Sequence, residues 1–141
     1  MQLEIRIDLI LHATENENKV LEELESVFHI EQKNFQIEQV PGHFNNPILL
    51  ISSKLKKKSA VDFVKIFFSK MKKEDFHEIF DNVDEYVTSS GLSLRISKQK
   101  LVSKIITISK EDAIKISIST PVYVKNETKK IYQELMKMWF W

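Results

Sequence analysis

Alternating apolar and polar residues predict the strands of a sheet with one buried face. Between Leu3 and Leu11 every second residue is apolar, which is the side-chain period of a strand, and Ile10 breaks this alternation. Between Ile48 and Ile51 four apolar residues follow one another, which favours a central strand contacted on both sides. The predicted strands span 3–11, 35–40, 48–55, 92–97 and 114–119, with a brief extended piece at 105–108.

Apolar residues three and four positions apart predict helices between these strands. The first predicted helix ends near 29, others cover 60–71, 76–87 and 126–139, and a short helical turn covers 98–104. Thr14 and Glu17 fit a capping box, and Ser59 and Asn126 are predicted N-caps. The order of elements predicts a single α+β domain, 1–141, built as a two-layer sandwich with helices packed on one face of a mostly antiparallel sheet.

A loop rich in proline and glycine joins the second and third predicted strands. One of the two glycines and two of the three prolines of the chain lie between Pro41 and Pro47. Glycine reaches positive φ and proline fixes φ, so this density predicts a tight reversal between antiparallel strands. Two interpretations stay open, namely ordinary turn chemistry and a functional loop held in a defined shape.

The composition argues against several classes of chemistry. Without cysteine the chain has no disulfides, no catalytic thiolate and no cysteine-bound zinc, and it suits a reducing cytoplasm. It contains no Gly-x-Ser-x-Gly elbow and no phosphate-cradling glycine loop, so we expect neither an enzyme nor a cofactor. The chain starts with a strand pattern and has no apolar run approaching about 20 residues, so we expect no signal peptide and no membrane segment.

The histidines offer one alternative to this non-catalytic interpretation. His12, His29, His43 and His77 do not have the spacing of a metal site. His12 ends a predicted strand and His43 lies in the 41–47 loop, so the two could meet in space. We expect a hydrogen-bonded loop histidine, and the alternative is a metal or acid–base site at this pair.

Charges are segregated along the chain although the net charge is only +1. The net charge is −6 over 1–40, +7 over 54–73, −6 over 74–85 and +6 over 86–141. Blocks of this kind either form opposed surface patches or are interleaved by folding. Bases clustered in space neutralise phosphates, and the alternative is a solvated lysine-rich surface. The candidate bases are Lys54, Lys56, Lys57, Lys58, Arg95, Lys98, Lys100 and Lys104.

The outward residues of the last two predicted strands are polar and carry no aromatic ring. They are Ser93, Arg95, Ser97, Lys115, Ser117 and Ser119. A sheet that stacks nucleic-acid bases needs exposed aromatic rings. Contact with a nucleic-acid backbone from basic edges and loops is therefore favoured over stacking on the sheet.

Several short segments together resemble a known family. They are His12-Ala13-Thr14-Glu15, Val20 to Leu24, Gly42-His43-Phe44-x-Asn46-Pro47-Ile48, Leu94-Arg95-x-x-Lys98-Gln99 and Asp112-Ala113-Ile114. In this order, between about residues 3 and 124, they resemble an archaeal family described as RNA-binding proteins or predicted exosome subunits, similar in fold to large-subunit ribosomal protein L-five. Asn45 and Ser97 depart from the family pattern, where glycine and aspartate are expected.

The resemblance implies a non-catalytic RNA-binding protein, cytoplasmic, and an accessory of RNA processing or of the exosome. It implies a site built from His12, Gly42, His43, Asn46, Lys98 and Gln99, and the phosphate contacts would come from Lys54, Lys56, Lys57, Lys58 and Arg95. We expect these bases to gather beside the 41–47 loop. The alternative is a protein–protein module that binds a processing partner or a second copy of the chain through the acidic helix at 76–87 and the aromatic tail 138–141.

Overall fold

The computed structural model describes residues 2–12, 17–42, 46–111 and 113–139. The elements are β1 (Glu4–His12), α1 (Glu17–Phe28), η1 (Gln32–Asn34), β2 (Gln36–Pro41), β3 (Pro47–Lys56), α2 (Lys57–Lys70), α3 (Lys73–Asp81), α4 (Val83–Tyr86), β4 (Val87–Thr88), β5 (Gly91–Ser97), α5 (Lys98–Val102), β6 (Ala113–Ser119), η3 (Lys125–Glu127) and α6 (Thr128–Trp139). The capping box predicted at Thr14 falls partly outside the described residues.

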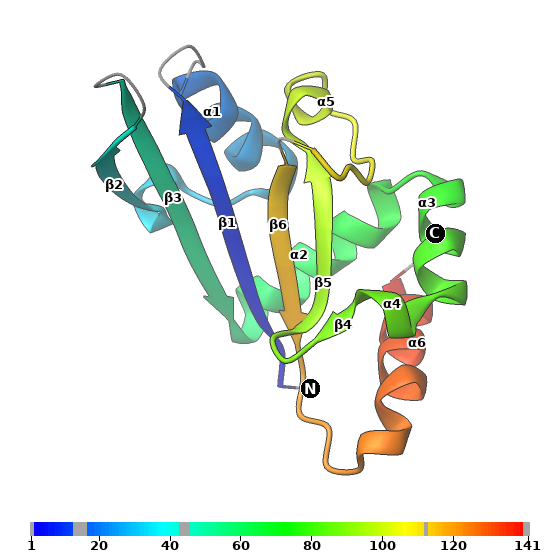
Figure 1. Ribbon diagram of the computed structural model, residues 1–141. Helices are drawn as coiled ribbons and strands as arrows, with labels where there is room; N and C mark the ends of the chain where they lie inside the picture. Colours follow the sequence, from blue (N-terminus) through cyan, green and yellow to red (C-terminus); the bar gives the residue numbers. More distant parts are fainter. Residues whose placement is uncertain (1, 13–16, 43–45, 112, 140–141) are drawn as a thin grey trace.

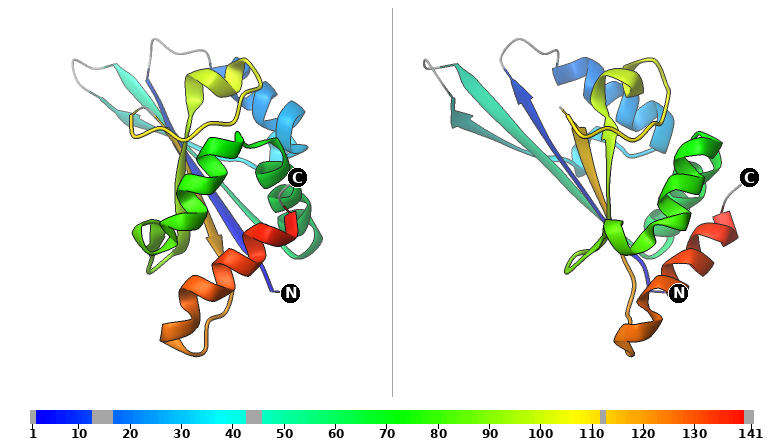
Figure 2. Two further views of the ribbon diagram at one scale, coloured as in Figure 1. Left: turned by 90° about the vertical axis from the view of Figure 1, so that its right-hand side faces the viewer. Right: turned by 45° about the vertical axis from the view of Figure 1, so that its right-hand side comes forward.

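The six strands form one antiparallel sheet in the order β2-β3-β1-β6-β5-β4. The helices cover one face of this sheet and leave the opposite face open (Figures 1 and 2). The predicted α+β fold with an antiparallel sheet is therefore confirmed. Among the described residues, no helix combines the length and the apolar character that crossing a membrane requires.

The core lies between the sheet and the helices. Alternate residues of β1, such as Ile5 and Ile7, are fully buried against this layer. The side chains of α2 add Phe63 and Phe67, whose ring centroids are 5.5 Å apart, and Phe28 of α1 lies 4.8 Å from Phe63. Burial of each such large side chain stabilises the fold by about 1.5–3 kcal/mol. The period-two pattern in β1 thus fixes which face of the sheet carries the helices.

The four apolar residues at 48–51 were expected on a strand contacted on both sides, and this expectation is wrong in one respect. β3 is an interior strand, between β2 and β1. Ile51 faces the helices and is 1% exposed, whereas Leu50 faces the open side and is 37% exposed. The continuous apolar run therefore marks an exposed apolar patch as well as a buried face.

The predicted helix over 76–87 is divided in two. α3 ends at Asp81 and α4 begins at Val83. The Asn82 side chain donates through Nδ2 to the Glu78 carbonyl at 2.9 Å. Asparagine side chains compete in this way for backbone groups, which weakens a helix interior. Val87, expected at the end of the helix, begins β4.

Two predicted N-caps are also wrong. Ser59 lies inside α2, where its hydroxyl donates to the Lys56 carbonyl at 2.8 Å. Asn126 lies in η3, and α6 begins at Thr128, whose hydroxyl donates to the Lys125 carbonyl at 2.8 Å. The hydroxyl of a serine or threonine near a helix start can accept a hydrogen bond from a backbone N–H or donate one to a backbone carbonyl. The residue type alone therefore does not fix the first helical residue.

The residue that directly follows α1 has a strained backbone. His29 has φ 59° and its N–H donates to the Glu25 carbonyl at 2.8 Å. The left-handed conformation at this position favours glycine, because a Cβ there meets the backbone. We expect His29→Gly to raise the free energy of unfolding by about 0.5–1 kcal/mol, measured by urea unfolding.

Glycine at an exposed helical position is the matched control for this change. Glu22 is exposed within α1. Glu22→Gly should lower the free energy of unfolding by about 1 kcal/mol, because glycine has poor helix propensity. A loss of stability in His29→Gly comparable to that in Glu22→Gly would contradict the interpretation of His29.

The sheet separates into two halves toward one end. β1 pairs with β3 over its whole length, but it pairs with β6 only from Glu4 to Asp8. Beyond Asp8, β1 and β6 diverge toward the upper end of the molecule (Figure 1). Strands β2, β3 and β1 form one wall, and β6, β5 and β4 form the other.

Candidate functional site

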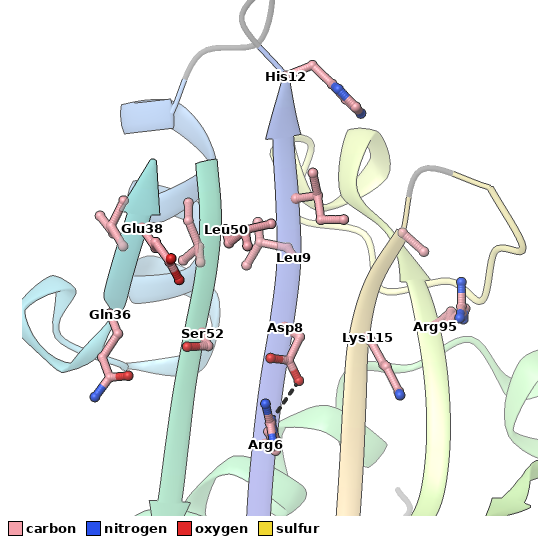
Figure 3. A pocket seen from close by; sticks show the side chains of 14 residues that line it. Arg6, Asp8, Leu9, His12, Gln36, Glu38, Leu50, Ser52, Arg95 and Lys115 are labelled. Carbon is pink, nitrogen blue, oxygen red and sulfur yellow. Dashed lines mark hydrogen bonds and ion pairs between the residues drawn. The ribbon is translucent and has the colours of Figure 1, made fainter. Parts of the chain in front are cut away.

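The open face of the sheet carries a hollow of about 780 Å³ (Figure 3). It lies across both walls of the sheet, from β2 to β5. The lining residues are Arg6, Asp8, Leu9, Ile10, His12, Gln36, Ile37, Glu38, Leu50, Ile51, Ser52, Arg95, Ala113 and Lys115. Three of these side chains are cationic and two are carboxylates, so the lining is mixed with a small excess of positive charge.

A row of polar side chains crosses the hollow from strand to strand. Gln36 pairs with Ser52, Ser52 with Asp8, Asp8 with Lys115, and Lys115 with Arg95. Neighbouring strands lie about 4.8 Å apart, so this polar row is about 19 Å long. It places hydrogen-bonding groups at one end and two cations at the other.

Two like charges face each other at the cationic end of the row. Arg95 and Lys115 are exposed and lie directly opposite on β5 and β6. Like charges in this position repel and destabilise a sheet. Within the described part of the chain, neither side chain has an ion-pair partner, and the nearby Asp8 carboxylate accepts from Arg6 Nε at 3.0 Å. The carboxylate opposite Lys115, that of Asp8, is already paired with Arg6, so this end of the row keeps an excess of positive charge for an external anion.

An apolar patch lies beside the polar row. Ile10 on β1 and Leu50 on β3 are paired across the strands and are 49% and 37% exposed. The break in alternation at Ile10 was the signal for this patch in the sequence. Only the strand register shows that Ile10 meets Leu50, because the two residues are far apart in the chain.

The two described ends of the 41–47 loop, at 41–42 and 46–47, lie at the upper end of the hollow. His12, at the end of β1, pairs with Ile48 just after the loop. The Gly42 N–H donates to the Asn46 carbonyl at 2.8 Å, and a Cβ on Gly42 would lie 2.3 Å from that oxygen. Glycine is thus required here by lack of space rather than by positive φ, which corrects the expectation. The predicted contact of His12 with His43 falls outside the described residues.

The lysines at the end of β3 do not join this loop. Ile48 and Lys56 lie eight positions apart on β3, a distance of about 27 Å along a strand. Lys54 Nζ lies 2.9 Å from Glu4 Oε1, and Lys56 Nζ lies 4.0 Å from Glu4 Oε2. The hydrogen bond from Lys54, followed by the charges of both lysines, lowers the pKa of Glu4.

The expected gathering of bases beside the loop is therefore wrong for the β3 lysines. Lys57 and Lys58 begin α2, next to Lys56 and away from the loop. Arg95 lies in the hollow, between the two ends. The basic end of β3 lies away from the loop. The charge blocks of the sequence are therefore distributed over several surfaces.

Lys98 and Gln99 begin α5 and have different surroundings. Gln99 is exposed, whereas Lys98 is 2% exposed and donates through Nζ to the Ile10 carbonyl at 2.7 Å. Gln99 remains accessible to a ligand. The Lys98 ammonium lies inside the protein, beneath the upper part of the hollow.

The polar row was only partly found from the sequence. The sequence identifies Lys115 as an outward strand residue but not as a binding residue. Its alternation with buried residues is the available signal, and its position opposite Asp8 and Arg95 depends on register. Arg6, beside the row, contacts Asp8 within β1 and was not among the candidate bases. Among the residues that the structure describes, no three His, Asp or Glu side chains are grouped closely enough to hold a metal ion.

Solved structures share this fold. The crystal structure of AF2318 from Archaeoglobus fulgidus, described as DUF54, has a TM-score of 0.78 at 23% identity and covers 96% of this chain and 99% of that chain. The crystal structure of SSO0741 from Sulfolobus solfataricus, also described as DUF54, has a TM-score of 0.76 at 25% identity and covers 96% and 98%. These similarities extend over nearly the whole fold.

Sequence comparison gives the family. A protein named RNA-binding protein PAB1135, from Pyrococcus abyssi, is 32% identical over 126 residues, which are 84% of this chain and 82% of that protein. The uncharacterised protein MJ0213 from Methanocaldococcus jannaschii is 25% identical over 135 residues, 90% of this chain and 91% of that protein. A family model described as RNA binding matches residues 4–120. The chain therefore belongs to this RNA-binding family.

Proposed function

We propose that this protein binds RNA without catalysis, through the open face of its sheet. The observation that carries the proposal is the opposed pair of Arg95 and Lys115, which lacks an ion-pair partner within the described residues. Proteins keep such locally unfavourable arrangements mainly at functional sites, which supports an anionic ligand at this pair. Membership of the RNA-binding family supports RNA phosphate as that anion.

Backbone contact is the mode of binding that this face supports. The described residues on the open face include no phenylalanine, tyrosine or tryptophan, so bases have no aromatic platform there. Arg95, Lys115 and Arg6 supply cations, and Ser52 and Gln36 supply neutral hydrogen-bonding groups. Ile10 and Leu50 would contact the apolar faces of ribose rings.

The sequence-predicted site divides into an upper rim and a lower group. The upper rim comprises His12, Gly42, Asn46 and Gln99, and His43 falls outside the described residues. The lower group comprises Lys54, Lys56, Lys57 and Lys58. In our proposal an RNA strand crosses the hollow from the upper rim past Arg95, and the lower group adds contacts for longer RNA.

We also propose a finer role for this protein, as a cytoplasmic accessory of RNA processing or of the exosome. The similarity to ribosomal protein L-five is likewise a prediction. The competing hypothesis of a protein–protein module relies on the acidic helix predicted at 76–87 and on the tail, of which Phe140 and Trp141 lie outside the described residues. No described contact favours that module over RNA binding.

Salt dependence tests the proposal directly. About four phosphate contacts give a log–log slope near −3 for single-stranded RNA, so the affinity should fall about 50-fold between about 50 and about 200 mM salt. Fluorescence anisotropy with labelled RNA at several salt concentrations measures this slope. An absence of binding at low salt, or an affinity that ignores salt, would reject the proposed function.

A further inference from the structure

Lys98 joins the two walls of the sheet at the point where they separate. β5 ends at Ser97, which pairs with Ala113 at the start of β6, and Lys98 follows directly. From there its Nζ reaches the Ile10 carbonyl on β1, at 2.7 Å. The last pair between β1 and β6 is that of Asp8, so this hydrogen bond lies beyond the end of the strand pairing.

The backbone of Lys98 is itself held in place. The Ser97 hydroxyl caps α5 by accepting from the Lys100 N–H at 3.1 Å. This cap fixes the first turn of the helix and with it the starting point of the Lys98 side chain. Ser97 stands where the family pattern led us to expect aspartate, and it provides a capping oxygen of its own.

Burial of an ammonium needs a structural reason. Lys98 is 2% exposed, and a buried charge is costly unless hydrogen bonds compensate it. A bond from an ammonium to a carbonyl is charge-assisted and stronger than a neutral one. The same residue that accepts this bond, Ile10, presents its side chain to the hollow with 49% exposure. Lys98 therefore bonds the backbone of a lining residue from beneath.

We propose that Lys98 is a positioning residue that sets the separation of the two walls and so the shape of the RNA-binding hollow. The inference rests on the proposed function, and it differs from the sequence-based expectation that Lys98 contacts phosphate. A phosphate contact needs an exposed ammonium, whereas a positioning role needs the buried one that the structure has.

Replacement of Lys98 by methionine separates these two roles. Lys98→Met keeps the length of the side chain and removes the charge. We expect the RNA affinity to fall about tenfold with an unchanged salt slope, and the amide hydrogens of 9–12 to exchange faster. If Lys98 contacted phosphate, the slope would become less steep by about 0.7. That change of slope, or an unchanged affinity, would overturn the inference.

A measurement on the unmodified protein covers the case in which Lys98→Met does not fold. An amine-acetylating reagent should leave Lys98 unmodified with and without RNA, because it is buried. The exposed Lys115 should react in the free protein and be protected by RNA. Modification of Lys98 that RNA prevents would overturn the inference.

The failure of the inference and that of the proposed function are distinguishable. If the unmodified protein binds no RNA, the proposed function fails, and the exchange of amides 9–12 in Lys98→Met still decides whether Lys98 holds β1. If RNA binds and Lys98→Met changes neither the affinity nor the exchange, only the positioning role fails.

Discussion

Replacing Arg95 and Lys115 together by glutamine is expected to weaken RNA binding by about 10- to 100-fold, because two charge-assisted contacts of about 1 kcal/mol or somewhat more are lost. The salt slope should become less steep by about 1.4, which is the effect of two phosphate contacts on a single strand. Anisotropy titrations at several salt concentrations measure both quantities. The register places the two side chains opposite each other, which is why they are replaced together.

The stability of the same variant distinguishes a binding role from a structural one. Removing two opposed cations relieves repulsion, so the free energy of unfolding should stay the same or rise by a few tenths of a kcal/mol, about 0.2–0.5. Loss of binding with no loss of stability is the expected signature of a functional surface. A variant that unfolds more easily would instead indicate that the pair supports the sheet.

The matched control removes the same charge elsewhere. Lys129 and Lys130 are exposed on α6, in the helical layer on the other side of the sheet (Figure 2). Lys129→Gln with Lys130→Gln should change the RNA affinity less than about threefold, since only the long-range field is altered. An equal loss of affinity in the control would show that net charge, rather than the hollow, governs binding.

Gly91→Ala is expected to lower the free energy of unfolding by about 3 kcal/mol or more. Gly91 has φ +100°, and a Cβ there would lie 2.3 Å from the Ile118 carbonyl oxygen. The backbone of β6 cannot move aside without disturbing its pairing with β5. Urea unfolding at a fixed temperature measures the change.

Ser89→Ala tests whether any substitution in this turn has the same effect. Ser89 is exposed in the turn between β4 and β5. Its replacement should change the free energy of unfolding by less than about 0.5 kcal/mol. If Gly91→Ala were as mild as Ser89→Ala, the close approach of Gly91 to β6 would not be a constraint on the fold.

The fold was predictable in those segments where the residue pattern fits only one type of secondary structure. The alternation in β1 and in β6 predicted these strands and their buried faces, and the apolar stripe around Phe67 predicted α2. The Asn82 break could not be foreseen, because it depends on a side chain bonding its own helix. The helix starts at 57 and 128 were missed because serine, threonine and asparagine bond the backbone in more than one way.

The candidate site was less predictable, because it depends on register. Arg95 was selected from the sequence, but its neighbour Lys115 was not, since 20 positions separate them and only the β5–β6 pairing brings them together. Lys98 was selected as a surface cation, although it is buried. Burial of a lysine depends on what surrounds it in space, and the sequence around Lys98 gives no sign of the Ile10 carbonyl.

The short pairing between β1 and β6 also limits the shape of a ligand that can contact both walls. Strand pairing joins the two walls only from Glu4 to Asp8, and strands rotate by about 20–25° from one to the next. Beyond that seam the walls turn away from a common plane, with Ile10 on one and Ala113 on the other. A flat ligand would contact a single wall, whereas a rounded, chain-like ligand would contact both walls.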